Sequence, residues 1–148
     1  DHSGTQFMHG EKFSRGLGKF HAVEHIPPDE VPDEEYPFVL STGRRLFHYH
    51  TGTMTRKGML DEHMPADYLE VNCADAQRLG IAEGDKLTVS SRRGSIEIPA
   101  RIADTVPSGV VFASFHFSET PINQLTNPKL DAISKIPEFK VCAVNVTK

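Results

Sequence analysis

The stretch that decides the fold reads Lys86-Leu87-Thr88-Val89-Ser90-Ser91-Arg92-Arg93-Gly94-Ser95-Ile96-Glu97-Ile98-Pro99-Ala100-Arg101-Ile102. Apolar and polar residues alternate on both sides of Arg92-Arg93-Gly94, and this period of two is typical of strands with one buried face. Because a short segment containing glycine separates the two runs, the pattern predicts a β-hairpin. The rest of the chain is therefore interpreted around a β-sheet.

Apolar runs on both sides of the hairpin predict four further strands, at residues 36–40, 68–71, 110–115 and 141–146. One helix is expected at residues 74–79, where Asn72 can cap its start and Gly80 can end it in a left-handed conformation. Residues 57–65 are expected to form a loop or a short helical turn. Short strands with one small helix predict a mainly β barrel or sandwich, whose polar loops converge at one end and bind a ligand there.

The residues before the first predicted strand differ in composition from the strand-rich remainder of the chain. Residues 1–18 are rich in Gly, His and aromatic residues without a regular period, which predicts a loop or an extended arm. Its apolar side chains either pack on this domain or on another one, or are isolated apolar residues exposed on the surface. Residues 25–35 are rich in proline and acidic residues, and predict an extended linker. We therefore divide the chain into an arm and linker, 1–35, and a barrel domain, 36–148. A start at Asp1 rather than Met leads us to expect that the chain was cut from a longer polypeptide or processed.

Composition excludes several classes of function. A net charge of −4 argues against general nucleic-acid binding. No apolar run approaches the roughly 20 residues that span a bilayer, so no membrane insertion by this chain is expected, and no signal peptide is present. Cys73 and Cys142 form no CxxC motif and are predicted to be buried free thiols. The cytoplasm is the default compartment, because any export signal would lie upstream.

Residues 41–56 are unusually rich in hydrogen-bond donors. Thr42-Gly43-Arg44 provides a hydroxyl, a residue tolerant of positive φ and a guanidinium, directly after a strand. A second donor-rich turn, residues 48–53, surrounds Gly52. Positive side chains cluster here on an otherwise acidic chain, and they predict an extended polyanionic ligand. The cluster consists of Arg44, Arg45, His48, His50, Arg56 and Lys57.

The sequence gives less support to metal binding and to catalysis. His48 and His50 would share a face on a strand and could bind a metal, but only His63 and Glu62 lie near enough to complete four ligands. The pattern favours anion contact over a metal site and leaves surface histidines as an equal alternative. His116 follows a strand directly and is predicted to point toward the same end of the barrel. No nucleophile elbow, cysteine–histidine motif or phosphate loop occurs, so we assign no catalytic residue and predict a binding domain.

Several motifs occur together in a fixed order. They are Leu40-Ser41-Thr42-Gly43-Arg44, Tyr49-His50-Thr51-Gly52-Thr53-Met54-Thr55-Arg56, Ala74-Asp75-Ala76 with Leu79-Gly80-Ile81, Ser91-Arg92-Arg93-Gly94, and Pro137-Glu138-Phe139-Lys140 with Ala143-Val144. This set resembles the C-terminal molybdopterin-dinucleotide-binding domain of the molybdenum and tungsten oxidoreductases, over essentially the whole chain. Residues 115–117, 125–128 and 134–144 are most similar to the formate dehydrogenase catalytic subunit.

The resemblance implies a double-psi β-barrel with short helices that binds a bis(molybdopterin guanine dinucleotide) cofactor. Upstream domains of the same polypeptide would hold the Mo or W and most of the substrate pocket, and iron–sulfur subunits would accept the electrons. The parent enzyme would oxidise formate to CO2, and the isolated domain would be inactive. The implied cofactor-binding residues are Thr42, Gly43, Arg44, His48, His50, Thr51 and Gly52 in the first loop, His116 after a strand, and Asn127, Phe139 and Lys140 in the last loop.

Two alternatives stay open. The same domain occurs in related enzymes such as nitrate reductase, whose terminal domain carries similar turns. A standalone double-psi barrel that serves as an interaction module belongs to a different functional class, and it would begin with a native methionine near Asp1.

Overall fold

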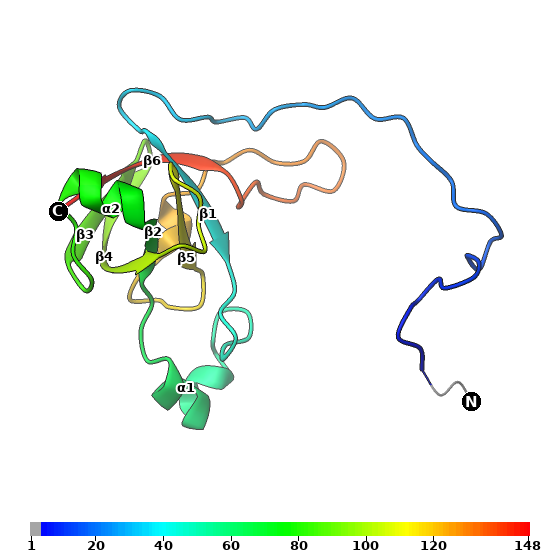
Figure 1. The fold of residues 1–148 in the computed structure, drawn as a ribbon, viewed down its shortest axis with the longest axis horizontal. Coiled ribbons are helices and arrows are strands. Elements are labelled where there is room, and N and C mark those ends of the chain that lie inside the picture. The colour runs from blue at the N-terminus through cyan, green and yellow to red at the C-terminus, as the bar shows by residue number, and fades with distance from the viewer. Residues whose placement is uncertain (1–3) are drawn as a thin grey trace.

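Six strands close into a barrel among residues 4–148, the part of the chain that the computed structural model describes (Figure 1). The first three residues of the predicted arm, 1–3, lie outside the described residues. Around the barrel the strands follow the order β1-β5-β2-β4-β3-β6. Their bounds are β1 (Phe38–Gly43), β2 (Leu69–Asn72), β3 (Lys86–Ser91), β4 (Gly94–Ala103), β5 (Val110–Ser114) and β6 (Cys142–Thr147).

The predicted hairpin is confirmed as β3 and β4, which pair antiparallel from Lys86↔Pro99 to Ser91↔Gly94. Leu87 faces Ile98 and Val89 faces Ile96 in this register, and all four side chains are buried. Alternation therefore places one face of each strand in the barrel interior. Burial of such aliphatic side chains, each worth about 1.5–3 kcal/mol, drives the closure of the barrel. Phe38, Leu40, Leu69, Val71, Val111 and Val144 from the other strands complete this core.

Two of the strand pairs are parallel, β1 with β5 and β2 with β4. In the first pair the register ends at Gly43↔Ser114, so both strands finish at the same edge of the barrel. The loops that follow them must start side by side at this edge. The closed barrel with short helices confirms the mainly β architecture, and its two parallel pairs are compatible with a double-psi arrangement.

The helices are short. α2 (Cys73–Leu79) begins where the Asn72 side chain accepts a hydrogen bond from the Ala74 N–H (2.9 Å), and it ends at Gly80 with φ 67°. Both predicted caps are therefore confirmed. η1 (Thr55–Lys57) and α1 (Met59–His63) form the expected helical turn, whereas η2 (Ile122–Gln124) lies between β5 and β6, where no helix was predicted. Among residues 4–148, no helix is long and apolar enough to cross a membrane.

The cysteine prediction is half wrong. Cys142 is buried on β6, but Cys73 is exposed at the first position of α2, where its thiol donates to the Asp104 carboxylate (3.0 Å). Small neighbours in the sequence do not indicate burial here, because Cys73 and Ala74 are exposed at the start of α2 whereas Asp75 and Ala76 are its buried residues. Both thiols are free.

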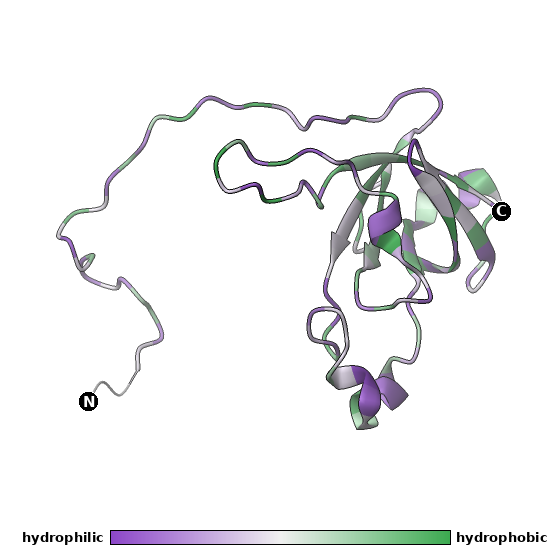
Figure 2. Cartoon of the chain, turned by 180° about the vertical axis from the view of Figure 1, so that it is seen from behind, coloured by the Kyte–Doolittle hydropathy of each residue, from purple (hydrophilic) through white to green (hydrophobic). Residues whose placement is uncertain are grey.

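The arm runs away from the barrel (Figure 1). Its apolar residues alternate with polar ones along an extended path, and they are not covered by the barrel (Figure 2). Leu17 and Phe20 are 95% and 101% exposed. Of the two packing alternatives predicted for the arm, packing on this domain is therefore wrong for these residues. Among residues 4–35, ion pairs with the barrel begin at Asp29 in the linker, and they are formed with Arg92, Arg93 and Lys129.

Candidate functional site

The shared edge of β1 and β5 carries most of the predicted cofactor-binding residues. Thr42 is buried near the end of β1, and its hydroxyl donates to the backbone carbonyl of Phe139 (2.7 Å). In return the Lys140 ammonium donates to the backbone carbonyl of Thr42. Residues almost a hundred positions apart in sequence are thus joined at one point. The first and last predicted loops form a single surface.

Two glycines allow the backbone to pack closely at this edge. A Cβ on Gly43 would lie 2.6 Å from the Phe112 ring of the neighbouring strand. Gly52 has φ 74°, and a Cβ there would lie 2.9 Å from the His116 carbonyl oxygen. Glycine is therefore required at position 52 both by conformation and by space. The turn around Gly52 packs directly against the segment after β5.

His116 is buried and joins three segments. Its Nε2 accepts the Arg45 N–H (2.8 Å), and its Nδ1–H donates to the His50 carbonyl. This pattern requires the neutral tautomer with the proton on Nδ1. Burial lowers the pKa of His116, and the nearby His48 and Arg44 lower it further, against the hydrogen bond to the His50 carbonyl and the charge of Asp67. His116 lies at the predicted end of the barrel, but its two ring nitrogens form hydrogen bonds with the backbone and do not face solvent.

His48 is likewise buried, with both ring nitrogens hydrogen-bonded inside the chain. Nε2–H donates to the Met64 carbonyl (2.7 Å), and Nδ1 lies 3.1 Å from the Thr55 hydroxyl. His50, two residues on, is exposed and has φ 48°. The two histidines do not share a face as they would on a strand. Among residues 4–148 no group of three or more His, Cys, Asp or Glu side chains could hold a metal ion.

The exposed part of the site is made by Arg44, Tyr49, His50 and Thr51. An Arg44 Nη lies 3.4 Å from His50 Nδ1, and its guanidinium lies 5.9 Å from the centre of the Tyr49 ring. Tyr49 and His50 meet edge to face, with ring centroids 4.1 Å apart. These contacts gather a cation, an imidazole and a phenol on one surface, where each can reach a ligand.

Asn127 is buried, and its side-chain amide is hydrogen-bonded within the last loop. Its Nδ2 donates to the Glu138 carboxylate (2.9 Å) and to the Val141 carbonyl (2.8 Å), while its Oδ1 accepts the Lys129 N–H (2.9 Å). Phe139, by contrast, is 38% exposed. Of the three predicted site residues in this loop, Asn127 therefore shapes the loop, whereas Phe139 and Lys140 are exposed.

The predicted cluster of positive charge is only partly free. Arg45 is enclosed by Asp67 and Glu70, lies 3.8 Å from the Tyr68 ring centre, and has a side chain only 7% exposed. Arg56 pairs with Asp61 (3.0 Å) and Glu119 (2.7 Å). Hence Arg45 and Arg56 serve the fold. Within residues 4–148, neither Arg44 nor Lys140 forms an ion pair with a carboxylate, although nine other Lys and Arg residues do: Arg45, Arg56, Arg78, Lys86, Arg92, Arg93, Arg101, Lys129 and Lys148.

Sequence reasoning missed Asp67, which organises this edge from beneath. It is fully buried, pairs with Arg45 Nε (3.3 Å), and its Oδ2 accepts the Ser114 N–H at the end of β5 (2.8 Å). Its neighbours in sequence, Ala66 and Tyr68, give no periodic signal that would indicate burial. The Ser114 hydroxyl is buried at the same edge without a hydrogen-bond partner among residues 4–148. The chemistry of this edge, with hydroxyls, an imidazole and two unpaired cations, fits an anionic polar ligand.

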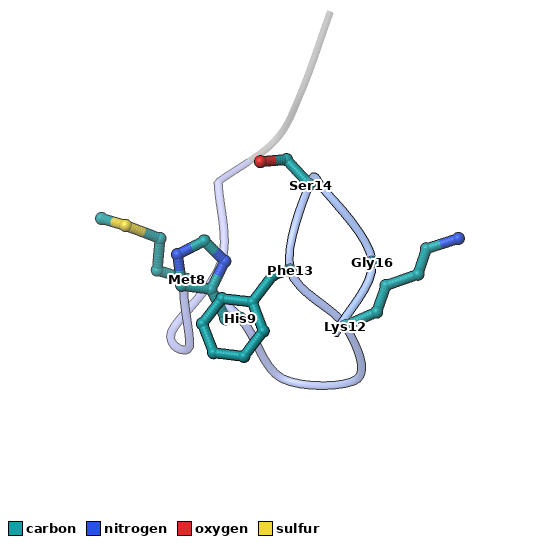
Figure 3. A pocket seen from close by; sticks show the side chains of 6 residues that line it. All are labelled: Met8, His9, Lys12, Phe13, Ser14 and Gly16. Atoms are coloured by element: carbon teal, nitrogen blue, oxygen red, sulfur yellow. The ribbon is translucent and has the colours of Figure 1, made fainter. Parts of the chain in front are cut away.

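A separate hollow lies within the arm, away from the barrel. Figure 3 shows Met8, His9, Lys12, Phe13, Ser14 and Gly16 around it. The rings of His9 and Phe13 lie 4.7 Å apart, and the backbones of Phe13 and Gly16 pair in a tight turn. Predicted cofactor-binding residues do not line this hollow. It is a local feature of the arm's own turn.

Comparison with known proteins gives a consistent result. Residues 38–143 match the model of the family described as Molydopterin dinucleotide binding domain. The chain is 50% identical over 148 residues to the F420-dependent formate dehydrogenase 2 subunit alpha of Methanococcus maripaludis, covering 98% of this chain and 22% of that protein. It is 46% identical over 140 residues to a nitrate reductase of Symbiobacterium thermophilum, covering 90% of this chain and 18% of that protein.

Among solved structures, the acetylene hydratase from Pelobacter acetylenicus superposes with a TM-score of 0.68. The match covers 89% of this chain and 21% of that protein at 17% identity, so it supports the fold alone. The chain spans about a fifth of the length of these relatives.

Proposed function

Because the chain belongs to the family of molydopterin dinucleotide binding domains, we propose that the edge formed by β1 and β5 binds the molybdopterin guanine dinucleotide of a formate dehydrogenase. The parent enzyme would carry two such dinucleotides and a Mo or W ion. When bound, this cofactor supplies the two-electron chemistry that oxidises formate to CO2. The domain itself binds and orients it.

The observation that carries the proposal is the pair of cations for which residues 4–148 provide no carboxylate partner, Arg44 and Lys140, at the edge where the two loops meet. A pyrophosphate and a polar pterin need cations, hydroxyls and N–H groups around them. A charge-assisted hydrogen bond contributes about 1.5–3 kcal/mol, so two such cations can hold a dinucleotide firmly. Arg44 with the His50-Thr51 turn would contact phosphate and pterin from one side, and Lys140 with Phe139 from the other.

The buried members of the site act differently. Thr42, His48, His116 and Asn127 have their polar groups engaged inside the chain. They fix the two loops in place before the cofactor arrives, and a preorganised site binds its ligand with a smaller loss of conformational entropy. Gly43 and Gly52 let the backbone pack closely enough for this arrangement.

The partners of the domain follow from the same proposal. The relatives are about five times longer than this chain, so upstream domains of the same polypeptide would hold the metal and cover the other face of the cofactor. Iron–sulfur subunits of the parent enzyme would take up the electrons. The two free thiols fit a reducing compartment, and we propose the cytoplasm. Cell fractionation with an antibody against the chain tests this last point.

Cofactor retention in the full-length protein tests the role of the two cations. We expect Arg44→Ala and Lys140→Ala each to lower the pterin and metal content after purification, and the double variant to lower it further. Lys86→Ala is the charge-matched control, because Lys86 lies in the hairpin in an exposed pair with Glu97. Unchanged content in both single variants and in the double variant would contradict the assigned site.

A nitrate reductase is the second candidate, supported by the 46% identity to the Symbiobacterium protein. Dye reduction with formate and dye oxidation with nitrate, assayed on the same full-length preparation, separate the two. We expect turnover with formate. The interaction-module alternative is tested by the coding sequence upstream of Asp1, where an open reading frame for further domains would exclude it.

A further inference from the structure

One residue of the acidic linker, Glu30, is held between two basic side chains of the barrel rather than solvated. Glu30 has a side chain only 11% exposed, and it lies between Arg92 (2.5 Å) and Arg93 (2.7 Å) at the turn of the β3–β4 hairpin. Arg92 also pairs with Asp33 and lies 4.7 Å from the Tyr36 ring centre. A linker that only had to connect two parts would not need these contacts.

Arg93 extends this contact to the last loop. Its Nη1 pairs with Glu30, while Nε and Nη2 both donate to the Leu125 carbonyl, at 3.0 and 2.6 Å. One planar guanidinium therefore joins the linker, the hairpin turn and the start of the segment 125–141.

Asp29 binds the same segment at two further points. Its carboxylate accepts the Lys129 ammonium (2.8 Å), and its N–H donates to the Glu138 carboxylate (3.3 Å). Glu138 also accepts from Asn127, which holds the Val141 carbonyl. The segment is thus fastened near both of its ends to the linker.

The middle of this segment is held by hydrogen bonds of its own backbone, such as those from the Asp131 N–H to the Ile136 carbonyl (2.9 Å) and from the Glu138 N–H to the Lys129 carbonyl (3.0 Å). Figure 1 shows the segment as a long loop that projects from the barrel before β6. Its apolar residues are largely uncovered, with Ile133 93% and Ile136 64% exposed. Because the loop lacks an apolar core of its own, its polar contacts must set its conformation. Besides the hydrogen bonds within the loop, those contacts run from the linker, through Arg93 and Glu138, to Phe139 and Lys140, which bind Thr42.

We propose that Glu30 and Arg93 are positioning residues: through them the acidic linker fixes the loop 125–141 so that Phe139 and Lys140 face the cofactor. Only the last step of this inference, from the loop 125–141 to the cofactor, rests on the proposed function. The link from linker to loop is a property of the chain itself and can be measured without cofactor. A change in the linker would thereby alter cofactor binding without touching the site.

Hydrogen exchange of the loop in the full-length protein, with and without cofactor, tests the proposal. Glu30→Gln and Arg93→Met are expected to speed exchange at the Lys129 and Glu138 amides about tenfold or more, and to lower pterin content. The control Glu97→Gln removes an exposed pair on the same hairpin and should change neither quantity. Unchanged loop exchange in both folded variants would overturn the proposal.

A conservative pair of substitutions distinguishes charge from packing at position 93. Arg93→Lys keeps a cation beside Glu30, whereas Arg93→Met keeps a side chain of similar length without charge. We expect the Lys variant to lie closer to the wild type in loop exchange. Equal or greater loosening by Lys than by Met would contradict a positioning role through Glu30. Faster exchange with unchanged pterin content would overturn the link to the cofactor and, with it, the contacts assigned to Phe139 and Lys140.

Discussion

The cations of the first loop differ in whether a carboxylate of the chain binds them. Arg44 and Arg45 are neighbours in sequence, yet Arg45 is buried with Asp67 and Glu70 while Arg44 is exposed without a carboxylate partner among residues 4–148. Truncating Arg45 would leave two carboxylates unbalanced, which destabilises the fold itself. Arg44 is thus the substitution that reports on binding, and its loss should leave the barrel folded.

The buried His116 makes stability depend on pH. Burial lowers its pKa in the folded chain, whereas the unfolded chain titrates near its ordinary value of about 6.5. Over that interval the unfolded state binds more protons, so the free energy of unfolding should fall as pH drops below about 6.5 and level off below the folded pKa. Urea unfolding between about pH 7.5 and pH 5 measures this.

Substitution assigns that effect to the residue. His116→Gln can keep both hydrogen bonds, to the Arg45 N–H and the His50 carbonyl, without a titrating ring. It should flatten the pH dependence, while His25→Gln, on the exposed arm, should not. An identical slope in the wild type and His116→Gln would rule out His116 as its source.

The close approach of Gly52 gives a second prediction. Gly52→Ala forces a Cβ to within 2.9 Å of the His116 carbonyl at φ 74°. Gly84→Ala imposes the same left-handed strain at φ 79°, but in open space. Strain alone costs about 1–3 kcal/mol, so both variants should be destabilised in urea unfolding and Gly52→Ala by clearly more. Equal losses would show that the turn tolerates the added methyl.

Among the elements, those with local signals could be predicted from the sequence. The hairpin followed from strict alternation, and α2 followed from Asn72 and Gly80, since caps depend on residues next to the helix. The projecting loop and the burial of Arg45, His48 and Asp67 could not be predicted, because they depend on contacts between distant segments. The exposed residue Arg44 was found in the donor-rich stretch after a predicted strand, and Lys140 was found through motif order. Neither signal carries information about what each side chain contacts.

The cap of α2 provides a test at the same scale. Asn72 accepts from the Ala74 N–H and also donates to the Val106 carbonyl (2.8 Å), so it ties the helix to the turn before β5. We expect Asn72→Ala to lower the free energy of unfolding by about 1–2 kcal/mol. Asn123→Ala, at an exposed position of η2, is the control and should change it by less than about 0.5 kcal/mol.

The whole molecule combines a closed barrel with an arm that the barrel leaves uncovered. Exposed apolar residues such as Leu17 and Phe20 fit a segment that packs on other domains, in agreement with relatives about five times longer than this chain. Under the proposed function, binding at the barrel edge would complete a cofactor site whose other wall lies elsewhere in the polypeptide. The linker contacts would then hold the barrel loop in the conformation that faces the cofactor.

The most direct test of the account is the cofactor content of the purified full-length protein. Metal analysis, together with fluorescence of the pterin released on denaturation, measures it. The account predicts Mo or W with a pterin dinucleotide in the wild type, and a marked loss of both in the Arg44→Ala and Lys140→Ala double variant with the fold retained. A full-length protein without Mo, W or pterin would contradict the central claim.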